Sequence, residues 1–257
     1  MRTLEQTQTV LRGNRLLSIY YTAGYPKLDA TLDIAEQLEK NGVDFLEIGI
    51  PYSDPVADGP VIQHSSEEAL KNGMSLSLLF EQLKGLRARV KIPVFLMGYF
   101  NTILQYGVEK FCAACQEVGV DGTIIPDLPL YEYEEMYQPI FEKYGISNVF
   151  LVTPQTSEER IRKIDALSTS FIYLLSSNAT TGKQLQVQEQ SEAYFKRIKD
   201  MNLNSPLVIG FGISNKETHQ KATDYANGAI VGTAFVRVLG QEGSQTENIK
   251  TFISSLK

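Results

Sequence analysis

Eight short, strongly apolar runs recur along this chain of 257 residues, and amphipathic segments typical of helices lie between them. Several of the runs are apolar throughout rather than alternating, which is typical of parallel strands buried on both faces. The sequence therefore predicts strands at Leu17–Tyr21, Phe45–Gly49, Val94–Gly98, Gly122–Ile125, Asn148–Val152, Phe171–Leu175, Leu207–Phe211 and Ala229–Val231.

The intervening segments carry helix start and stop signals such as acidic first turns and C-terminal glycines. They predict helices at Asp29–Asn41, Ser75–Arg89, Gln188–Met201 and Asn215–Tyr225, and another that opens at Ser157. Eight β/α units without a linker predict an α/β fold in which residues 1–257 form a single domain, a (β/α)8 TIM barrel with extra helices. A doubly wound parallel sheet is the alternative that this pattern leaves open.

Composition excludes several classes of function. The net charge of −6 argues against a nucleic-acid-binding face. The first residues lack the apolar core of a signal peptide, and the longest apolar runs are too short to cross a bilayer, so we expect no membrane segment. Cys112 and Cys115 lie in a helical pattern without a second pair, which favours two packed thiols in a reducing cytoplasm. His64 and His219 read as ordinary helix positions, so we expect no metal site.

One strand carries a carboxylate near its end. Glu47 lies within the apolar run Phe45–Gly49, and Asp58 follows eleven positions later in a loop of Gly, Pro and Asp. A charged group is costly to bury in a strand unless it is paired or used. In a barrel of this kind the catalytic groups lie at the C-terminal ends of the strands, so both side chains are expected at the same mouth. We interpret them as an acid/base pair.

Three glycine-containing turns follow the last three strands, at residues 180–182, 210–214 and 231–235. Glycine lets the backbone approach a ligand closely, and the last two turns are expected to run straight into helices with free amide groups. Such amides bind phosphate without a lysine, so we expect a phosphorylated substrate here. Aromatic residues are expected near the same mouth, where inward-facing rings would suit a flat apolar substrate, although each ring by itself is more typical of core: Tyr20, Tyr99, Tyr173 and Phe211.

These motifs resemble one family closely. Residues 47–63, Glu-Ile-Gly-Ile-Pro-Tyr-Ser-Asp-Pro-Val-Ala-Asp-Gly-Pro-Val-Ile-Gln, are similar to the signature of the tryptophan synthase α subunit nearly residue for residue. Supporting matches occur at residues 22–26 (Thr-Ala-Gly-Tyr-Pro), 126–129 (Pro-Asp-Leu-Pro) and 210–214 (Gly-Phe-Gly-Ile-Ser), and the resemblance covers essentially the whole chain.

The resemblance implies retro-aldol cleavage of indole-3-glycerol phosphate to indole and glyceraldehyde 3-phosphate. It implies that Glu47 is the general acid/base and that Asp58 holds the indole N–H and stabilises the charge that develops on the ring. Further implied substrate contacts are Tyr173 on the glycerol side, Tyr20, Ile62, Met97, Leu151 and Phe211 around the indole, Thr181 in a closing lid, and Gly182, Gly212, Gly232 and Thr233 at the phosphate. Ala179 and Thr180 depart from the family's usual lid sequence, which puts the lid's hinge and closure in question.

The resemblance also implies a partner. The family works as an α2β2 heterotetramer in which the β subunit, not this chain, holds pyridoxal phosphate, and indole passes between the subunits. Tyr52, Asp54 and Pro55 are then expected to touch that partner, the alternative being a merely rigid turn. A stand-alone indole-releasing lyase remains the closest alternative. A Schiff-base aldolase would need a strand lysine, which the predicted strands lack, and a non-catalytic barrel would be expected without Glu47 or Asp58.

Overall fold

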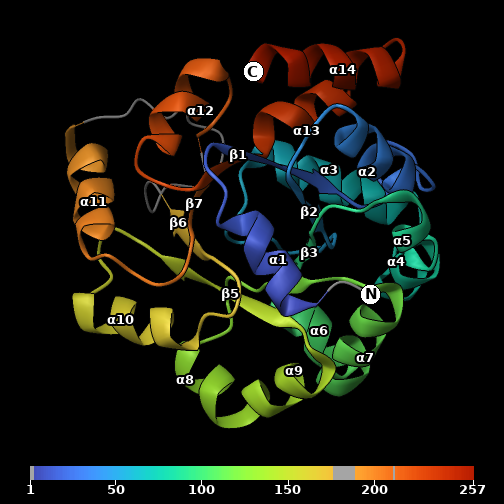
Figure 1. Ribbon diagram of the computed structural model, residues 1–257. Coiled ribbons are helices and arrows are strands. Elements are labelled where there is room, and N and C mark those ends of the chain that lie inside the picture. Colours follow the sequence, from blue (N-terminus) through green and yellow to red (C-terminus); the bar gives the residue numbers. More distant parts are fainter. Residues whose placement is uncertain (1–2, 176–188, 211) are drawn as a thin grey trace.

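The computed structural model describes residues 3–175, 189–210 and 212–257. Within this part of the chain, eight parallel strands close into a barrel with helices around it (Figure 1). The strands are β1 (Leu16–Thr22), β2 (Phe45–Gly49), β3 (Val94–Met97), β4 (Gly122–Ile124), β5 (Ser147–Val152), β6 (Ile172–Leu175), β7 (Leu207–Gly210) and β8 (Gly228–Val231). The predicted (β/α)8 barrel is confirmed. The doubly wound alternative is wrong, because β8 pairs back onto β1 and leaves no open sheet edge.

The helices are α1 (Leu4–Leu11), α2 (Thr31–Lys40), α3 (Pro60–Lys71), α4 (Leu76–Leu83), α5 (Leu86–Arg89), α6 (Phe100–Tyr106), α7 (Val108–Val118), α8 (Leu130–Glu132), the π-helix η1 (Tyr133–Tyr137), α9 (Gln138–Tyr144), α10 (Glu158–Leu167), α11 (Glu189–Asp200), α12 (Lys216–Thr223), α13 (Thr233–Leu239) and α14 (Gln245–Leu256). The prediction of one helix over residues 75–89 is wrong. Gly85, a poor helix former, lies between α4 and α5 with φ −88° and ψ 1°, and the helix breaks there.

Alternate residues of each strand point into the barrel, because side chains in a strand alternate between its two faces. Phe45, Phe95 and Phe171 meet inside, with ring centroids 5.2 to 6.1 Å apart. The outward positions of the same strands pack under the surrounding helices and form the larger apolar core. Cys112 and Cys115 belong to that core as free, buried thiols on α7, as predicted.

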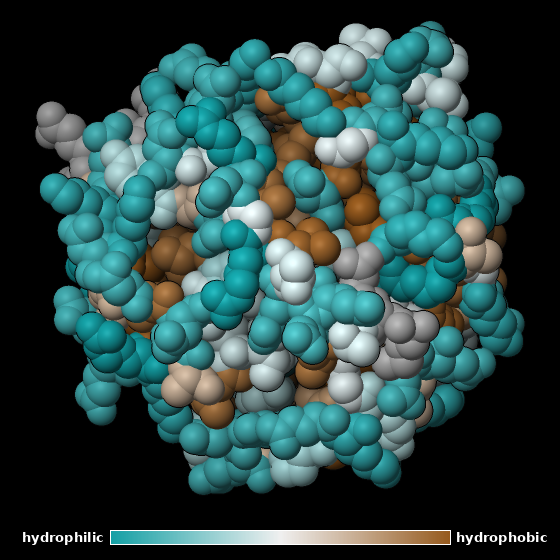
Figure 2. Space-filling view, in the orientation of Figure 1, coloured by the Kyte–Doolittle hydropathy of each residue, from teal (hydrophilic) through white to brown (hydrophobic). Residues whose placement is uncertain are grey.

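The outer surface is mostly hydrophilic in the view of Figure 1, where apolar residues appear mainly in recesses between polar ones (Figure 2). His64 and His219 lie on α3 and α12, as expected. None of the helices in the described residues is long and apolar enough to cross a membrane.

The N-terminal end of the barrel is covered by α1, whose Leu11 packs into the interior cluster. A buried carboxylate ties this helix to the sheet. The Oδ1 atom of Asp121 accepts a hydrogen bond from the Thr7 hydroxyl at 2.9 Å, and its Oδ2 accepts one from the backbone N–H of Val94 at 2.8 Å. The same Oδ2 forms an ion pair with Arg87. One side chain therefore joins α1, α5 and β3 at the end of the barrel opposite the mouth.

Replacing Asp121 by alanine is expected to lower the free energy of unfolding by about 2–4 kcal/mol, because it removes several buried hydrogen bonds and an ion pair at once. The matched control is Asp33→Ala. Asp33 also pairs with an arginine, Arg89, but its side chain is 65% exposed, so about 1 kcal/mol or less is expected. Urea unfolding of the three proteins measures both effects, and equal losses would contradict the role given to Asp121.

Candidate active site

Glu47 is a fully buried carboxyl group in the interior of the barrel. It lies on β2 two residues after Phe45, and in the sheet it is level with Tyr20 on β1 and Phe95 on β3. Neither carboxyl oxygen has a hydrogen-bond partner among the described residues. Burial raises the pKa of Glu47 to about 8, since nothing nearby compensates the ionised form for its lost hydration. At neutral pH this group is mainly protonated and can donate its proton.

Asp58 lies at the edge of a cavity of about 390 Å³ at the C-terminal end of the barrel. Tyr20, Met97 and Leu151 line the same cavity, so the structure brings together four residues that the sequence singled out from four separate segments. Burial raises the pKa of Asp58 to about 6, and a hydrogen bond from Tyr99 opposes that rise. The two carboxyl groups therefore differ in character: at pH 7 Asp58 is mainly ionised and Glu47 mainly neutral.

Tyr99 connects the Asp58 side chain to the backbone of its own loop. The Tyr99 hydroxyl donates to Oδ2 of Asp58 at 3.1 Å and accepts from the Ala57 N–H at 2.9 Å. The sequence predicts Tyr99 near the mouth but indicates no role for it. The only available signal was an aromatic residue following a strand, and such a residue is equally typical of core.

Two glycines make room for the tyrosines that lie near both acids. A Cβ atom on Gly49 would lie 2.2 Å from the Tyr20 hydroxyl oxygen, and one on Gly210 would lie 1.9 Å from that of Tyr173. Each tyrosine thus lies across a strand position that only glycine can occupy. Ile62 and Tyr173 are buried in the interior cluster that contains Tyr20, but neither of them lines the cavity itself.

The glycine residues after β7 and β8 differ in what they offer an anion. Gly232 is the N-cap of α13 and Thr233 its first residue, with no side chain capping the helix. A Cβ on Gly232 would lie 3.6 Å from the Cβ of Tyr20, so the amides at this helix start lie beside the cavity wall. Gly212 has φ +77°, which favours glycine.

The expectation that both turns run straight into a helix with free amides is wrong for the turn at residues 210–214. Asn215 intervenes before α12, and its side chain accepts the Thr218 N–H at 2.9 Å in a capping box. The start of α12 therefore uses one of its own amides internally. Thr181, Gly182 and Phe211 lie outside the described residues, as do Ala179 and Thr180, so their predicted roles stay predictions.

The loop after β2 forms the rim of the site. The Tyr52 ring packs on Tyr99 with centroids 5.2 Å apart, and its hydroxyl accepts from the Asn101 amide at 3.3 Å. Asp54 is exposed and Pro55 partly exposed. In the part of the chain that the structure describes, no group of three or more His, Cys, Asp or Glu side chains could hold a metal ion.

Comparison with known proteins decides the family. The family model described as tryptophan synthase alpha chain matches residues 7–256. The chain is 55% identical over 250 residues to the tryptophan synthase alpha chain of Christiangramia forsetii, covering 97% of both chains. This chain belongs to the tryptophan synthase alpha chain family. The resemblance carried by residues 47–63 is thereby confirmed.

Other tryptophan synthase alpha chains extend the comparison. That of Flavobacterium johnsoniae is 55% identical over 251 residues, covering 98% of both chains. Among solved structures, a chain from the tryptophan synthase complex of Pyrococcus furiosus matches with a TM-score of 0.86 and 34% sequence identity, covering 95% of this chain and 98% of that one. The likeness therefore extends over nearly the full length in both sequence and fold.

Substituting Glu47 by glutamine is expected to stabilise the fold increasingly as pH rises from about 4.5 to 8. In this window the unfolded chain has lost a proton that the folded protein still holds, so the wild-type free energy of unfolding falls with pH. Glutamine does not titrate. Near pH 8 the gain should be on the order of 5–10 °C in Tm. Thermal unfolding at a series of pH values measures the difference, and a difference that does not change with pH would contradict the raised pKa.

Proposed function

We propose that this chain catalyses the α reaction of tryptophan synthase, the cleavage of indole-3-glycerol phosphate to indole and glyceraldehyde 3-phosphate. The proposal rests on family membership and on one observation in the site. Glu47 is a neutral, fully buried carboxyl group level with Tyr20, which lines the cavity. Asp58, at the edge of that cavity, is a second carboxyl group that is mainly ionised at neutral pH. This is the combination that a retro-aldol cleavage of an indole requires.

In the proposed mechanism, Glu47 donates its proton to C3 of the indole ring, which leaves positive charge at the ring nitrogen. Asp58 accepts a hydrogen bond from the ring N–H and stabilises that charge. Glu47, now ionised, takes the proton of the hydroxyl group next to the bond that breaks. The O–H electron pair forms the aldehyde carbonyl, the C–C pair returns to the ring, and Glu47 regains its proton. Burial supports this role because it raises the pKa of Glu47 to a value near the pH at which the group must donate and accept the proton.

Substrate binding follows the same division of the site. Tyr20, Met97 and Leu151 are proposed to enclose the indole, with Ile62 behind them. The amide groups at the start of α13 are proposed to hold the phosphate together with Gly212, Gly232 and Thr233, since an uncapped helix start attracts an anion. Tyr173 is proposed to contact the glycerol moiety, and Thr181, Gly182 and Phe211 keep the roles that the family resemblance implies.

A β subunit is the proposed partner, in an α2β2 assembly, and it would hold the pyridoxal phosphate; this chain is proposed to need no cofactor. Relatives carry the name tryptophan synthase alpha chain, and one solved relative comes from a tryptophan synthase complex. Large apolar side chains also lie exposed in the connections after β2, β3 and β4: Val56 (81%), Leu104 (49%) and Tyr131 (61%). Because these connections share the mouth side of the barrel, they support a docking face there together with Tyr52, Asp54 and Pro55.

The cytoplasm is the proposed location, supported by the two free, buried thiols Cys112 and Cys115.

The stand-alone lyase is the less favoured function. It would leave the exposed apolar residues around the mouth without a purpose, and the names of the relatives do not favour it.

The purified chain is expected to release indole from indole-3-glycerol phosphate slowly, and faster when a cognate β subunit is added. Absence of indole release with and without the β subunit would refute the proposed reaction. A rate that no β subunit changes would instead favour the stand-alone lyase.

The Glu47→Gln variant is expected to lose turnover by about 10³-fold or more, because glutamine neither donates nor accepts the transferred proton. Its affinity for indole-3-propanol phosphate, which keeps the ring N–H and the phosphate, should stay within about threefold, because the carboxyl contributes to the chemical step rather than to phosphate binding. Calorimetric titration gives this affinity. Near-normal turnover in the variant would show that another residue is the general acid.

A further inference from the structure

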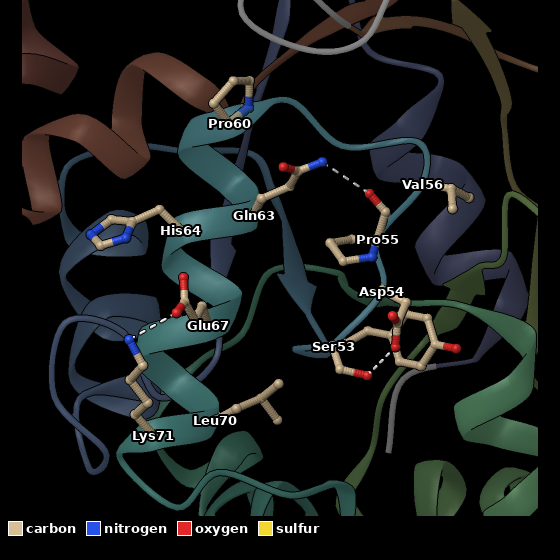
Figure 3. A pocket seen from close by; sticks show the side chains of 11 residues that line it. Ser53, Asp54, Pro55, Val56, Pro60, Gln63, His64, Glu67, Leu70 and Lys71 are labelled. Atoms are coloured by element: carbon tan, nitrogen blue, oxygen red, sulfur yellow. Dashed lines mark hydrogen bonds and ion pairs between the residues drawn. The ribbon is translucent and has the colours of Figure 1, made fainter.

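The turn at residues 55–58 is a thin wall between two hollows. On its inner side lies the cavity that Asp58 borders. On its outer side lies a surface groove of about 720 Å³, between the loop after β2 and helix α3 (Figure 3). Val56 and Tyr52 line both hollows. The position of the Asp58 carboxylate in the inner cavity therefore depends on what fixes the backbone of this turn.

The turn at residues 55–58 has little internal hydrogen bonding of its own. Within it the Asp58 N–H donates to the Pro55 carbonyl at 3.3 Å, and Val56 at its tip is 81% exposed. The following residues, Gly59 and Pro60, start α3, so the C-terminal end of the turn is attached directly to that helix. A turn with so little burial of its own needs outside partners to hold one conformation.

Gln63 supplies such a partner from α3. Its side-chain Nε2 donates to the Asp58 carbonyl at 2.8 Å and to the Pro55 carbonyl at 3.3 Å, which are the two ends of the turn. An amide NH₂ group has two donors, so one side chain can serve both carbonyls. Figure 3 shows the Gln63 amide directed from the helix toward Pro55. The Gln63 side chain therefore connects the two ends of the turn on the side that faces the outer groove.

Asp58 is thus held at two points. Gln63 fixes its backbone from the outer side, and Tyr99 fixes its carboxylate from the inner side. A charge that stabilises a transition state must be placed closely, because a shift of about 1 Å can cost about 10²-fold in rate. Loss of either contact should therefore reduce catalysis while leaving the barrel intact.

We propose that Gln63 is a positioning residue for Asp58: its amide clamps both ends of the turn at residues 55–58 and so sets the place of the Asp58 carboxylate in the cavity. The inference rests on the proposed function, because it assigns Gln63 an effect on the indole-binding carboxylate. Gln63 itself lines the outer groove, and it acts on the reaction through Asp58.

The test compares Gln63→Met with His64→Met in the full-length chain. Methionine has nearly the length of glutamine but donates no hydrogen bond. His64 is the next residue on α3 and lines the same groove, and the described residues offer its side chain no hydrogen bond to the turn, so the same substitution there is the matched control. We expect Gln63→Met to lower kcat for indole-3-glycerol phosphate by about tenfold and to raise KM severalfold, because the Asp58 carboxylate also accepts the ring N–H of the bound substrate, and His64→Met to leave both unchanged.

A double-mutant cycle with Asp58→Asn separates positioning from general damage. Binding of indole-3-propanol phosphate, measured by calorimetry, should weaken severalfold on Gln63→Met when Asp58 is present, and not further when asparagine replaces it, because coupled residues are non-additive. Equal weakening in both backgrounds, or an unchanged kcat, would overturn the proposal. If the wild-type chain neither cleaved the substrate nor bound the analogue, the proposed function itself would be refuted, a result distinct from a Gln63 effect that is absent.

Discussion

The pairing of β8 with β1 is the interaction on which the rest of the structure depends. It closes the sheet, so the inward side chains of every strand share one enclosed interior. Within that interior Glu47 has no hydrogen-bond partner among the described residues, and burial alone raises its pKa to about 8. The chemistry proposed for this residue is therefore a product of barrel closure rather than of a particular neighbour.

Asp58, the second acid, is held in place in a different way. Asp58 lies on a turn that few apolar contacts secure, and hydrogen bonds from Gln63 and Tyr99 hold it. The site thus joins one half that is built by apolar packing to another half that is built by individual polar contacts. The position of Glu47 depends on the whole barrel, and the position of Asp58 depends on a few side chains.

The strands and the family could be predicted from sequence because their signals are local. Apolar runs identified all eight strands to within about a residue at each end, and Glu47 was conspicuous as a charge within such a run. The break of the helix at Gly85 was missed because the leucine spacing continues across it. The contact of Gln63 with the turn could not be predicted for a different reason. An exposed glutamine on a helix has no distinctive pattern, and its value comes from carbonyl groups that only the folded loop brings within reach. Asn215 was predicted as the first residue of its helix, and the structure makes it the N-cap instead.

The wall between the two hollows is one turn thick, and this constrains how the protein can vary. Tyr52 and Val56 each face both sides, so a substitution that improves the fit of the outer groove also reshapes the chamber where the ring would bind. Neither residue can therefore be substituted to suit one surface without affecting the other. Any lineage that remodels its outer surface at this turn must therefore find changes that the inner chamber also tolerates, or compensate for them across the wall.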